Sequence, residues 1–425
     1  MSIHGGDLVE KYIINGGNRL TGEISISGAK NAVLPILAAT VIGGNKSIIS
    51  NIPNLRDVEI MKEILIALGC AVDGTGSTMV IDSKPLNQII VPEELVREMR
   101  SSIIFMGAML ARTGEVIISY PGGCEIGPRP IDLHLKALRN MGAEIEESHG
   151  HLYCKTEGLK GADIQLDYPS VGATENIILA GVTAEGTTII RNAAREPEII
   201  DLQNYLNKSG ARISGAGTSV ITIEGVKDLR DVTHSIISDR IVTGTIMTAA
   251  AITGGDIIIN NVIVDHVIGI IAKMKEAGVM IYSNGTSMKV TGPRRINPIE
   301  MLQTLPYPGF PTDMQAQMMA LLSIANGTSI ISETVFENRF KHAEELTRMG
   351  ANIKTFGRVA VISGVKELTG AKTTAKDLRG GAALTLAGLV ARGTTEVYNI
   401  HHIERGYEDL HLMLQKLGAD IIKSN

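Results

Sequence analysis

Residues 186–213 read GTTIIRNAAREPEIIDLQNYLNKSGARI, and this stretch contains the unit from which the whole chain is built. It opens on Gly186, ahead of a β-rich run. It closes on Gly210, where a helical segment ends and a short strand begins. Helices often end in a left-handed residue, a conformation that glycine adopts without steric cost. The stretch therefore predicts a strand, a helix and the start of a further strand.

The same pair of glycines recurs six times along the chain. The closing glycines are Gly69, Gly142, Gly210, Gly278, Gly350 and Gly418, separated by 73, 68, 68, 72 and 68 residues. The opening glycines lie 23 to 28 residues upstream, at Gly44, Gly114, Gly186, Gly255, Gly327 and Gly393. An internal period of this length indicates repeated supersecondary units. Six units in 425 residues predict an α/β protein of two domains with three units each.

Each unit is expected to hold two helices of different character. In the second helix, Met61, Ile64, Leu65 and Leu68 follow the i, i+3, i+4, i+7 spacing, which gives one apolar stripe. The first helix, as in residues 31–42, is apolar nearly all round. This composition predicts that the first helix is buried inside its domain.

The domain boundary is predicted near Asp239, before the first helix of the fourth unit. The N-terminal strands, within residues 7–27, precede a first helix just as a strand pair precedes each later one, so we expect them to complete the last unit. The domains are then residues 30–239, which carry the loop around Cys124, and residues 1–29 with 240–425. A chain that crosses twice makes a hinge, and ligands favour clefts between domains.

The composition is that of a soluble globular enzyme, with 44% apolar and 20% charged residues. A chain without tryptophan and with a net charge of −5 argues against a nucleic-acid partner, although a local cationic pocket can still bind small anions. Three widely spaced cysteines argue against disulfides or a zinc site and predict a reducing, cytoplasmic location. Neither a signal peptide nor an apolar run long enough for a membrane span is evident.

Cys124 lies in the loop PGGCEIGPRP, residues 121–130, which also places Arg129 between two prolines. The glycines allow the loop to move, and the prolines stiffen the segment that carries the arginine. A thiol beside a fixed cation on a mobile loop indicates a catalytic cysteine that meets an anionic substrate when the loop closes. The alternative is a small buried apolar residue, which is the usual role of a free cysteine. Cys70 and Cys154 lie at strand positions that close repeats, and we expect them to be packing residues.

The first helices begin at polar and charged residues, where free N–H groups and a partial positive charge make an anion site. Asp239 and Ser170 are readily explained as ordinary N-caps. Lys30, Arg100 and Arg379 oppose the helix dipole, which a bound anion would explain. The helix starts are Lys30-Asn31, Arg100-Ser101, Ser170-Val171, Asp239-Arg240, Thr312-Asp313 and Asp377-Leu378-Arg379.

Taken together and in order, six segments resemble the UDP-N-acetylglucosamine 1-carboxyvinyltransferases, the MurA family of enolpyruvyl transferases. The segments are SGAKNA (27–32), the loop at 121–130, NAAREPE (192–198), FPTDMQAQ (310–317), ETVFENR (333–339) and RGYE (405–408). The resemblance covers nearly the whole chain. It implies two inside-out, barrel-like α/β domains of three βαβαββ units each, with the active site in the cleft between them.

The resemblance also implies an enzyme of peptidoglycan synthesis. The family moves the enolpyruvyl group of phosphoenolpyruvate to the 3'-hydroxyl of UDP-N-acetylglucosamine, releases phosphate and passes through a tetrahedral ketal. It uses no metal or organic cofactor, although Cys124 would form a covalent adduct with phosphoenolpyruvate and react with fosfomycin. The implied partners are these two small molecules, without nucleic acid or membrane, and the oligomeric state is left open.

The resemblance assigns roles position by position. Cys124 would protonate the methylene carbon, and Asp313 would contact the sugar hydroxyl and act as base. Phosphoenolpyruvate would be bound by Lys30, Asn31, Arg129 and Arg405, of which Lys30 and Arg405 are counted as catalytic. The nucleotide sugar would be bound by Arg100, Arg129, Pro130, Ile131, Asp132, Leu133, Tyr168, Ser170, Val171, Gly172, Asp313 and Val335. Arg339, Asp377 and Arg379 are assigned a supporting role.

Two alternatives are kept. A sister enzyme that transfers enolpyruvate to shikimate 3-phosphate shares the fold and one substrate, but residues 121–130 and 310–317 are the nucleotide-sugar enzyme's versions. A catalytically silent paralogue would bind nucleotide sugar without turning it over. The joint presence of Lys30, Cys124, Asp313 and Arg405 argues against the second alternative.

Overall fold

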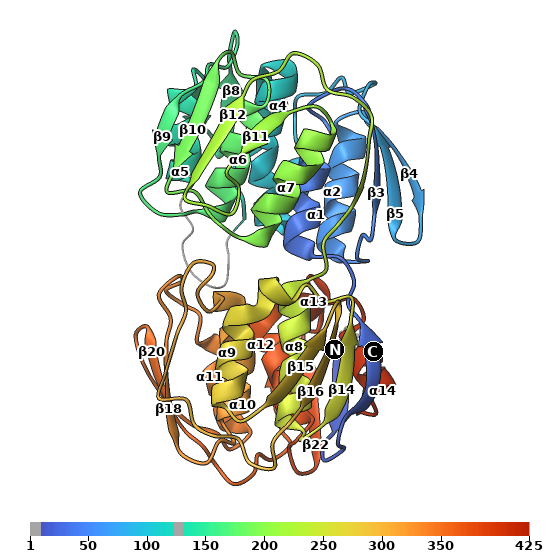
Figure 1. The fold of residues 1–425 in the computed structure, drawn as a ribbon, viewed down its shortest axis with the longest axis vertical. Coiled ribbons are helices and arrows are strands. Elements are labelled where there is room, and N and C mark those ends of the chain that lie inside the picture. The colour runs from blue at the N-terminus through green and yellow to red at the C-terminus, as the bar shows by residue number, and fades with distance from the viewer. Residues whose placement is uncertain (1–9, 123–130, 425) are drawn as a thin grey trace, which may run out of the picture. The chain divides into compact units, whose positions relative to one another are not determined.

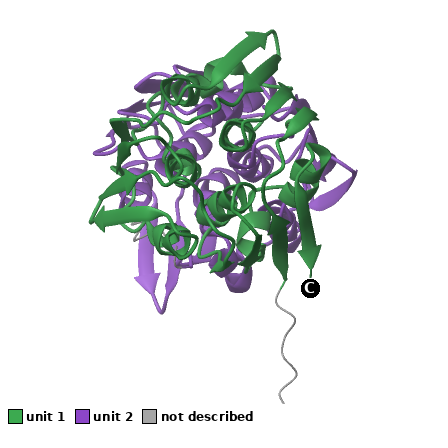
Figure 2. Ribbon diagram, turned by 90° about the horizontal axis from the view of Figure 1, so that it is seen from below, with its two compact units in different colours: residues 1–26, 125–127, 238–425 green, residues 27–124, 128–237 purple. Residues whose placement is uncertain are grey.

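Repeats of the predicted βαβαββ kind make up the chain in a computed structural model, which describes residues 10–122 and 131–424 (Figure 1). The described residues separate into two units (Figure 2). Unit 1 contains residues 10–26 and 238–424, and unit 2 contains residues 27–122 and 131–237. The chain thus changes unit after residue 26 and again after residue 237, close to the predicted positions at Lys30 and Asp239. Within the described residues, no helix is both long and apolar enough to cross a membrane.

Unit 2 holds the first three repeats, with sheets ordered β13-β3-β5-β4, β6-β8-β7 and β11-β12-β10-β9. Its strands are β3 (Lys46–Ser50), β4 (Ala71–Thr75), β5 (Thr78–Asp82), β6 (Glu115–Ser119), β7 (Glu144–Ser148), β8 (His151–Lys155), β9 (Asp163–Gln165), β10 (Thr187–Arg191), β11 (Arg212–Ser214), β12 (Val220–Glu224) and β13 (Val232–Ser235). Its helices are α1 (Lys30–Ala39), α2 (Arg56–Ala67), α3 (Glu93–Glu98), a 3-10 helix (Arg100–Ile104), α4 (Phe105–Thr113), α5 (Asp132–Asn140), α6 (Val171–Gly181) and α7 (Pro197–Lys208).

Unit 1 holds the other three repeats, with sheets ordered β15-β16-β14-β2, β17-β18-β20-β19 and β21-β22-β1-β23. Its strands are β1 (Lys11–Asn15), β2 (Thr21–Ser25), β14 (Asp256–Asn260), β15 (Met280–Asn284), β16 (Ser287–Thr291), β17 (Met301–Gln303), β18 (Thr328–Ser332), β19 (Asn352–Phe356), β20 (Val359–Ser363), β21 (Lys372–Thr374), β22 (Thr394–Tyr398) and β23 (Asp420–Ser424). Its helices are α8 (Arg240–Ile252), a 3-10 helix (Val264–Val267), α9 (Ile268–Glu276), a 3-10 helix (Thr312–Met314), α10 (Gln315–Leu322), α11 (Lys341–Arg348), α12 (Leu378–Gly388), α13 (His401–Glu404) and α14 (Leu410–Lys416).

The first helix of each repeat lies inside its unit, as its all-round apolar composition predicts. In unit 1, α8, α10 and α12 pack on one another, and every residue of α8 is buried. In unit 2, α4 packs on both α1 and α6. Figure 2 views unit 1 end-on, with helices toward its middle and sheets at its rim. The helices therefore form the interior of each unit and the sheets form its wall.

The closing glycines adopt the left-handed backbone conformation that the sequence predicts for them. All six, from Gly69 to Gly418, have φ between 91° and 111°. A side chain is strained in this region, so glycine is the residue that ends each second helix at low cost. The prediction of six helix ends at these glycines is confirmed.

A further mark of the repeat escaped the sequence analysis. Asn51, Asn192, Asn261 and Asn399 each follow the first strand after the opening glycine, and each has φ between 56° and 59°. The amides of the first three donate to backbone carbonyls of the neighbouring parallel strand or the residue after it, at 2.7–2.9 Å. The equivalent position in the fifth repeat is Glu333, six residues after its opening glycine. Asparagine tolerates the left-handed region, and in three of these four repeats its amide also links the strand to its neighbour.

The strands that precede the two crossings pair within the unit that the chain is about to leave. As expected, β1 completes the sixth repeat, where it lies between β22 and β23. In contrast, β2 pairs in parallel with β14 of the fourth repeat, and β13 pairs in parallel with β3 of the first. The prediction that both N-terminal strands complete the last unit is therefore wrong for β2. The chain changes unit directly after each of these strands. Each strand therefore belongs to the unit before the crossing, where it serves as the first strand of a repeat.

Candidate functional site

The predicted site residues are distributed over both units, most of them at or near the starts of the buried helices. Unit 2 carries Lys30, Asn31, Arg100, Ile131, Asp132, Leu133, Tyr168, Ser170, Val171 and Gly172. Unit 1 carries Asp313, Val335, Arg339, Asp377, Arg379 and Arg405. Three predicted residues, Cys124, Arg129 and Pro130, lie outside the described residues.

In unit 1, one carboxylate is held by two arginines. Arg339 donates from Nη2 to Oδ1 of Asp313 at 2.7 Å, and Arg379 donates from Nη2 to Oδ2 at 3.0 Å. The arginine side chains are 4% and 3% exposed, whereas that of Asp313 is 25% exposed. The 3-10 helix before α10, the loop before α11 and the first turn of α12 bring these three residues together. The family resemblance implies a supporting role for both arginines, and both contact the predicted base directly.

This cluster has more positive charge than its carboxylate offsets. Two guanidinium groups share one carboxylate, so the three side chains sum to about +1. Among the described residues, Arg339 Nε and the Nε and Nη1 atoms of Arg379 are buried without a hydrogen-bond partner. Buried donors without partners are costly and need an explanation. An anion bound at this cluster would satisfy these donors, and part of the positive charge is already offset by the carboxylate of Asp239, which acts on Arg379.

The ionisation of Asp313 reflects the same arrangement. Burial raises the pKa of Asp313, but the charges of Arg379 and Arg339 outweigh burial and hold the pKa well below its usual range. The carboxylate is therefore ionised at neutral pH, yet it is a weak base while both arginines hold it. An anion that draws the arginines toward itself would make Asp313 more basic.

A buried polar network contacts the Arg379 side chain through Tyr407. Its guanidinium lies 5.2 Å from the ring centroid of Tyr407. The Tyr407 hydroxyl is 2.8 Å from the hydroxyl of Thr245 and accepts from Gln317 Nε2 at 3.0 Å. Thr245 and Gln317 belong to the buried helices α8 and α10, in which Thr243, Thr248 and Gln315 are buried polar residues as well.

Glu333 organises the loop that carries Val335. Its Oε1 accepts from the backbone N–H groups of Val335 and Phe336 at 2.9 and 3.0 Å, and from the Thr304 hydroxyl at 2.9 Å. Its Oε2 accepts from the Thr312 hydroxyl at 2.8 Å, next to Asp313. Glu333 is 1% exposed and occupies the position that asparagine holds in four other repeats. The fifth repeat thus has glutamate in place of the asparagine, and this glutamate positions the segments that carry Asp313 and Val335, two predicted site residues.

Several helix-start residues act as N-caps. Asp377 accepts from the backbone N–H groups of Arg379 and Gly380, both at 2.9 Å. Asp239 caps α8 through the N–H groups of Ile241 and Val242, and Ser170 caps α6. The N-cap interpretation is therefore correct for Asp239 and Ser170, and it applies to Asp377 as well.

In unit 2, Lys30 forms a buried ion pair at the start of α1. Its Nζ lies 2.7 Å from Oδ2 of Asp57 in α2, and the two side chains are 11% and 2% exposed. A carboxylate thus faces this cation within the unit itself, which the sequence analysis did not foresee. Asn31 follows in the first turn of α1 and is half-buried.

A neutral histidine supports the predicted nucleotide-sugar residues of unit 2. Asn176 accepts from the N–H of Gly107 at 2.7 Å and donates to the carbonyl of Ile103 at 3.0 Å, so its remaining hydrogen points to Nδ1 of His134 at 2.8 Å. His134 Nδ1 is then the acceptor, and its proton resides on Nε2. Burial, with the charge of Arg100, lowers the pKa of His134 to about 4.

The histidine ring also packs against α6. A Cβ added to Gly172 would lie 3.1 Å from Cε1 of His134, closer than an ordinary contact. A side chain at position 172 would therefore require the histidine ring to shift by a few tenths of an ångström where the first turn of α6 meets α5. His134 was missed because its role depends on this contact, although it directly follows the predicted residues Ile131, Asp132 and Leu133.

The remaining candidates are placed as follows. Arg100 begins a 3-10 helix ahead of α4, Tyr168 is 42% exposed before α6, and Arg405 is half-buried after α13. Cys70 and Cys154 are buried, in agreement with a packing role, and burial raises the pKa of each thiol to about 12. In the described part of the chain, no group of three or more His, Cys, Asp or Glu residues is arranged to hold a metal ion.

The chain shares its architecture of two units of three repeats with enolpyruvyl transferases. The chain belongs to the EPSP synthase (3-phosphoshikimate 1-carboxyvinyltransferase) family, whose model matches residues 14–414. The enolpyruvyl transferase NikO from Streptomyces tendae superposes with a TM-score of 0.89 at 26% identity, over 98% of this chain and 99% of that one. An EPSP synthase from Acinetobacter baumannii has a TM-score of 0.77 at 18% identity, over 98% and 100% of the two chains, and this similarity concerns the fold alone.

Relatives with higher sequence identity to this chain are named for one particular reaction. The chain is 54% identical to UDP-N-acetylglucosamine 1-carboxyvinyltransferase 2 of Caldanaerobacter subterraneus subsp. tengcongensis over 413 residues, which cover 97% of this chain and 99% of that protein. It is also 54% identical to UDP-N-acetylglucosamine 1-carboxyvinyltransferase 1 of Carboxydothermus hydrogenoformans over 417 residues, or 98% and 99% of the two chains. These relatives match essentially from end to end, so their similarity extends to both units.

Proposed function

We propose that the protein transfers the enolpyruvyl group of phosphoenolpyruvate to the 3'-hydroxyl of UDP-N-acetylglucosamine and releases phosphate. The observation that carries this proposal is the 54% identity, along 97% of the chain, to relatives named for that reaction. The cation-rich helix starts supply chemistry that fits a doubly anionic substrate. We assign the reaction to peptidoglycan synthesis in the cytoplasm, without a metal or organic cofactor.

The proposed reaction is an addition followed by an elimination. The sugar 3'-oxygen bonds to C2 of phosphoenolpyruvate while its proton passes to Asp313 and a proton from Cys124 goes to C3. The resulting tetrahedral ketal then loses a proton from C3 as the C2–O bond to phosphate breaks. The carbon–carbon double bond re-forms in the product, and inorganic phosphate leaves with the bonding electrons. Lys30, Asn31, Arg129 and Arg405 hold phosphoenolpyruvate in this scheme.

The unit 1 cluster gives Arg339 and Arg379 a direct part in this scheme. Their buried, unpartnered N–H groups fit a carboxylate or phosphate of phosphoenolpyruvate, because guanidinium groups bind such anions in fork geometry. When that anion shares the arginines, their hold on Asp313 weakens and its pKa rises toward a value useful for a base. Binding of phosphoenolpyruvate would thus activate Asp313 for the sugar hydroxyl.

In our proposal, the acceptor UDP-N-acetylglucosamine binds to residues whose positions are fixed by two buried side chains, Glu333 and His134. Glu333 fixes the loop with Val335, and neutral His134 fixes the first turn of α6 with Gly172. Both regions were predicted to bind the nucleotide sugar. In our proposal, Arg100 and the residues 131–133 and 170–172 bind the nucleotide and sugar on unit 2, while Asp313 and Val335 contribute from unit 1.

The proposal is tested by phosphate release from phosphoenolpyruvate, with and without UDP-N-acetylglucosamine, for the wild type, Cys124→Ser and the control Cys154→Ala. We expect release that requires the nucleotide sugar, is lost or severely slowed in Cys124→Ser and persists in Cys154→Ala. Release that depends on shikimate 3-phosphate would identify the sister reaction instead. Binding of the nucleotide sugar without release by the folded wild type would identify a silent paralogue.

A further inference from the structure

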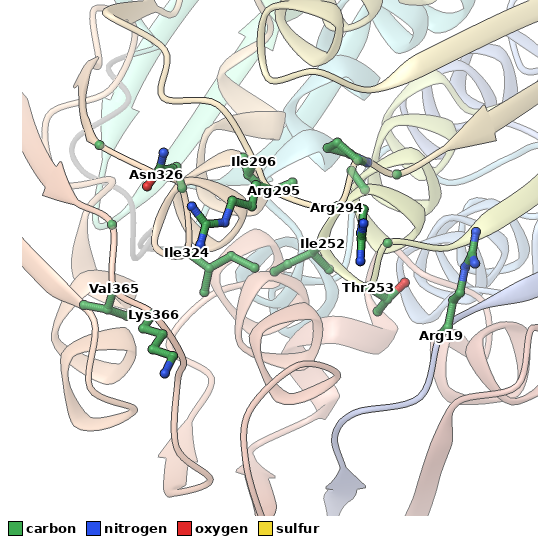
Figure 3. A pocket seen from close by; sticks show the side chains of 17 residues that line it. Arg19, Ile252, Thr253, Arg294, Arg295, Ile296, Ile324, Asn326, Val365 and Lys366 are labelled. Carbon is green, nitrogen blue, oxygen red and sulfur yellow. The ribbon is translucent and has the colours of Figure 1, made fainter.

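A second pocket in unit 1 is separate from the candidate site. It has a volume of about 700 Å3 and lies where α8 and α10 end, lined by residues 251–254 and 324–327 (Figure 3). Asp313 and Asp239 lie at the opposite ends of these helices. A helix of 13 residues, the length of α8, spans about 20 Å. The pocket therefore shares no residue with the proposed reaction.

Equivalent turns of all three repeats in unit 1 bring cations to this pocket. Arg19 follows β1, Arg294 and Arg295 follow β16, and Lys366 follows β20. Each of these strands lies between two others in its sheet, so the three turns occupy the same place in their repeats. In unit 2 the corresponding turns contain Lys84, Glu157 and the pair Lys227-Asp228, and this pair matches Lys366-Glu367 in unit 1. Arg19, Arg294 and Arg295 are therefore the cations that distinguish the turns of unit 1 from those of unit 2.

The pocket's charge is not balanced by its surroundings. The four cationic residues are exposed, and no Asp or Glu is among the lining residues. No hydrogen bond or ion pair joins these cations to described residues, although the charge of Arg19 acts on the nearby carboxylate of Asp256. The neighbouring carboxylate of Asp256 accepts from Thr291 at 2.9 Å and pairs with Lys289 at 3.2 Å. The C-terminal ends of α8 and α10 contribute about −0.5 charge each, which leaves roughly +3 at the pocket. Two helix ends therefore do not account for four unpaired cations.

The walls offer both polar and apolar contacts. Figure 3 shows Arg295 turned toward Asn326 and Arg294 turned toward Thr253. The lining also includes the apolar residues Ile296, Ile324, Val365 and Pro293. Ligand pockets of proteins commonly have volumes of about 300–1,000 Å3, apolar walls and a few placed polar groups. The pocket has the size and the lining of a small-molecule site.

We propose that this pocket binds a nucleoside diphosphate or a closely similar small polyanion. A diphosphate carries about three negative charges at neutral pH, which matches the net charge of the pocket. Arginine forks suit adjacent phosphates, and three arginines and a lysine are available from three segments. The apolar wall receives the organic part of the ligand. This inference is independent of the proposed reaction, because it rests on other residues.

The test is calorimetric titration of the full chain with ADP and, separately, with inorganic pyrophosphate at low salt. The variant Arg294→Ala/Arg295→Ala removes two exposed side chains, so its melting temperature should match the wild type. Lys227→Ala removes an exposed lysine from the equivalent turn in unit 2 and serves as the control. If the double variant folds poorly, Lys366→Ala replaces it in the same comparison.

We expect saturable binding of ADP that weakens at least tenfold in the double variant, remains in Lys227→Ala and weakens as salt is raised. Hydrogen exchange should slow around residues 292–296 and 363–367 when ADP is bound. The site is overturned if ADP does not bind saturably, if the double variant binds as the wild type does, or if Lys227→Ala loses as much affinity. Equal affinity for ADP and pyrophosphate would overturn the assignment of the apolar wall to the organic part.

Discussion

Replacement of Glu333 by glutamine tests how the loop around Val335 is held. The carboxylate accepts four hydrogen bonds of 2.8–3.0 Å, from the hydroxyls of Thr304 and Thr312 and two backbone N–H groups. In Glu333→Gln, the three bonds to Oε1 become neutral ones. The new NH2 group faces Thr312, whose hydroxyl already accepts from Arg339 at 3.2 Å.

The expected cost follows from these contacts. Hydrogen bonds to a charged group contribute about 1.5–3 kcal/mol and neutral ones about 0.5–1.5 kcal/mol, so four weakened bonds sum to about 4 kcal/mol. Relief from burying a charge offsets part of this cost. We therefore expect Glu333→Gln to lose about 2–4 kcal/mol of unfolding free energy, or roughly 5–15 °C in melting temperature for a unit of this size.

Calorimetry of Glu333→Gln beside Glu337→Gln measures this difference. Glu337 pairs with Arg358 at 2.9 Å, but its side chain is 55% exposed, so its variant should melt within about 2 °C of the wild type. If the proposed function holds, Glu333→Gln should also raise the KM for the nucleotide sugar more than that for phosphoenolpyruvate. A Glu333→Gln protein as stable as Glu337→Gln would refute the reasoning.

Three further predictions follow from buried groups. Asp57→Asn should lower the free energy of unfolding, measured with denaturant, by about 3 kcal/mol because it leaves Lys30 buried without its counter-ion. Asp167→Asn, which breaks an exposed pair with Lys136, should lower it by under about 0.5 kcal/mol. Equal losses in the two variants would contradict this reasoning. His134 has its pKa lowered from 6.5 to about 4, so its contribution to stability is complete above pH 6.5 and is lost as the pH falls toward 4, by about 3 kcal/mol in total. The pH dependence of unfolding between 6.5 and 4 should be shallower in His134→Gln, and an unchanged slope would argue that the ring is protonated in the native state. Cys70 and Cys154, with thiol pKa values of about 12, should resist iodoacetamide at pH 8 until the protein is unfolded, as read by intact mass.

The sequence by itself determined the local parts of this protein. Six closing glycines were recognised because a left-handed helix end restricts the residue type directly. The buried first helices were recognised because an all-round apolar helix has no face for water. The family was recognised because six short segments occur in order, and each can be identified from its own residues without knowledge of the residues that lie beside it in space.

Only the tertiary structure decided which distant residues meet. The exchange of β2 and β13 between sheets could not be predicted, since any strand of this length and composition fits the first-strand place of several repeats. Likewise, many carboxylates could have faced Arg379, and its pairing with Asp313, 66 residues away in sequence, depends on how α10 and α12 pack. Local patterns fix conformation one residue at a time, whereas long-range pairs are chosen by packing among many equivalent partners.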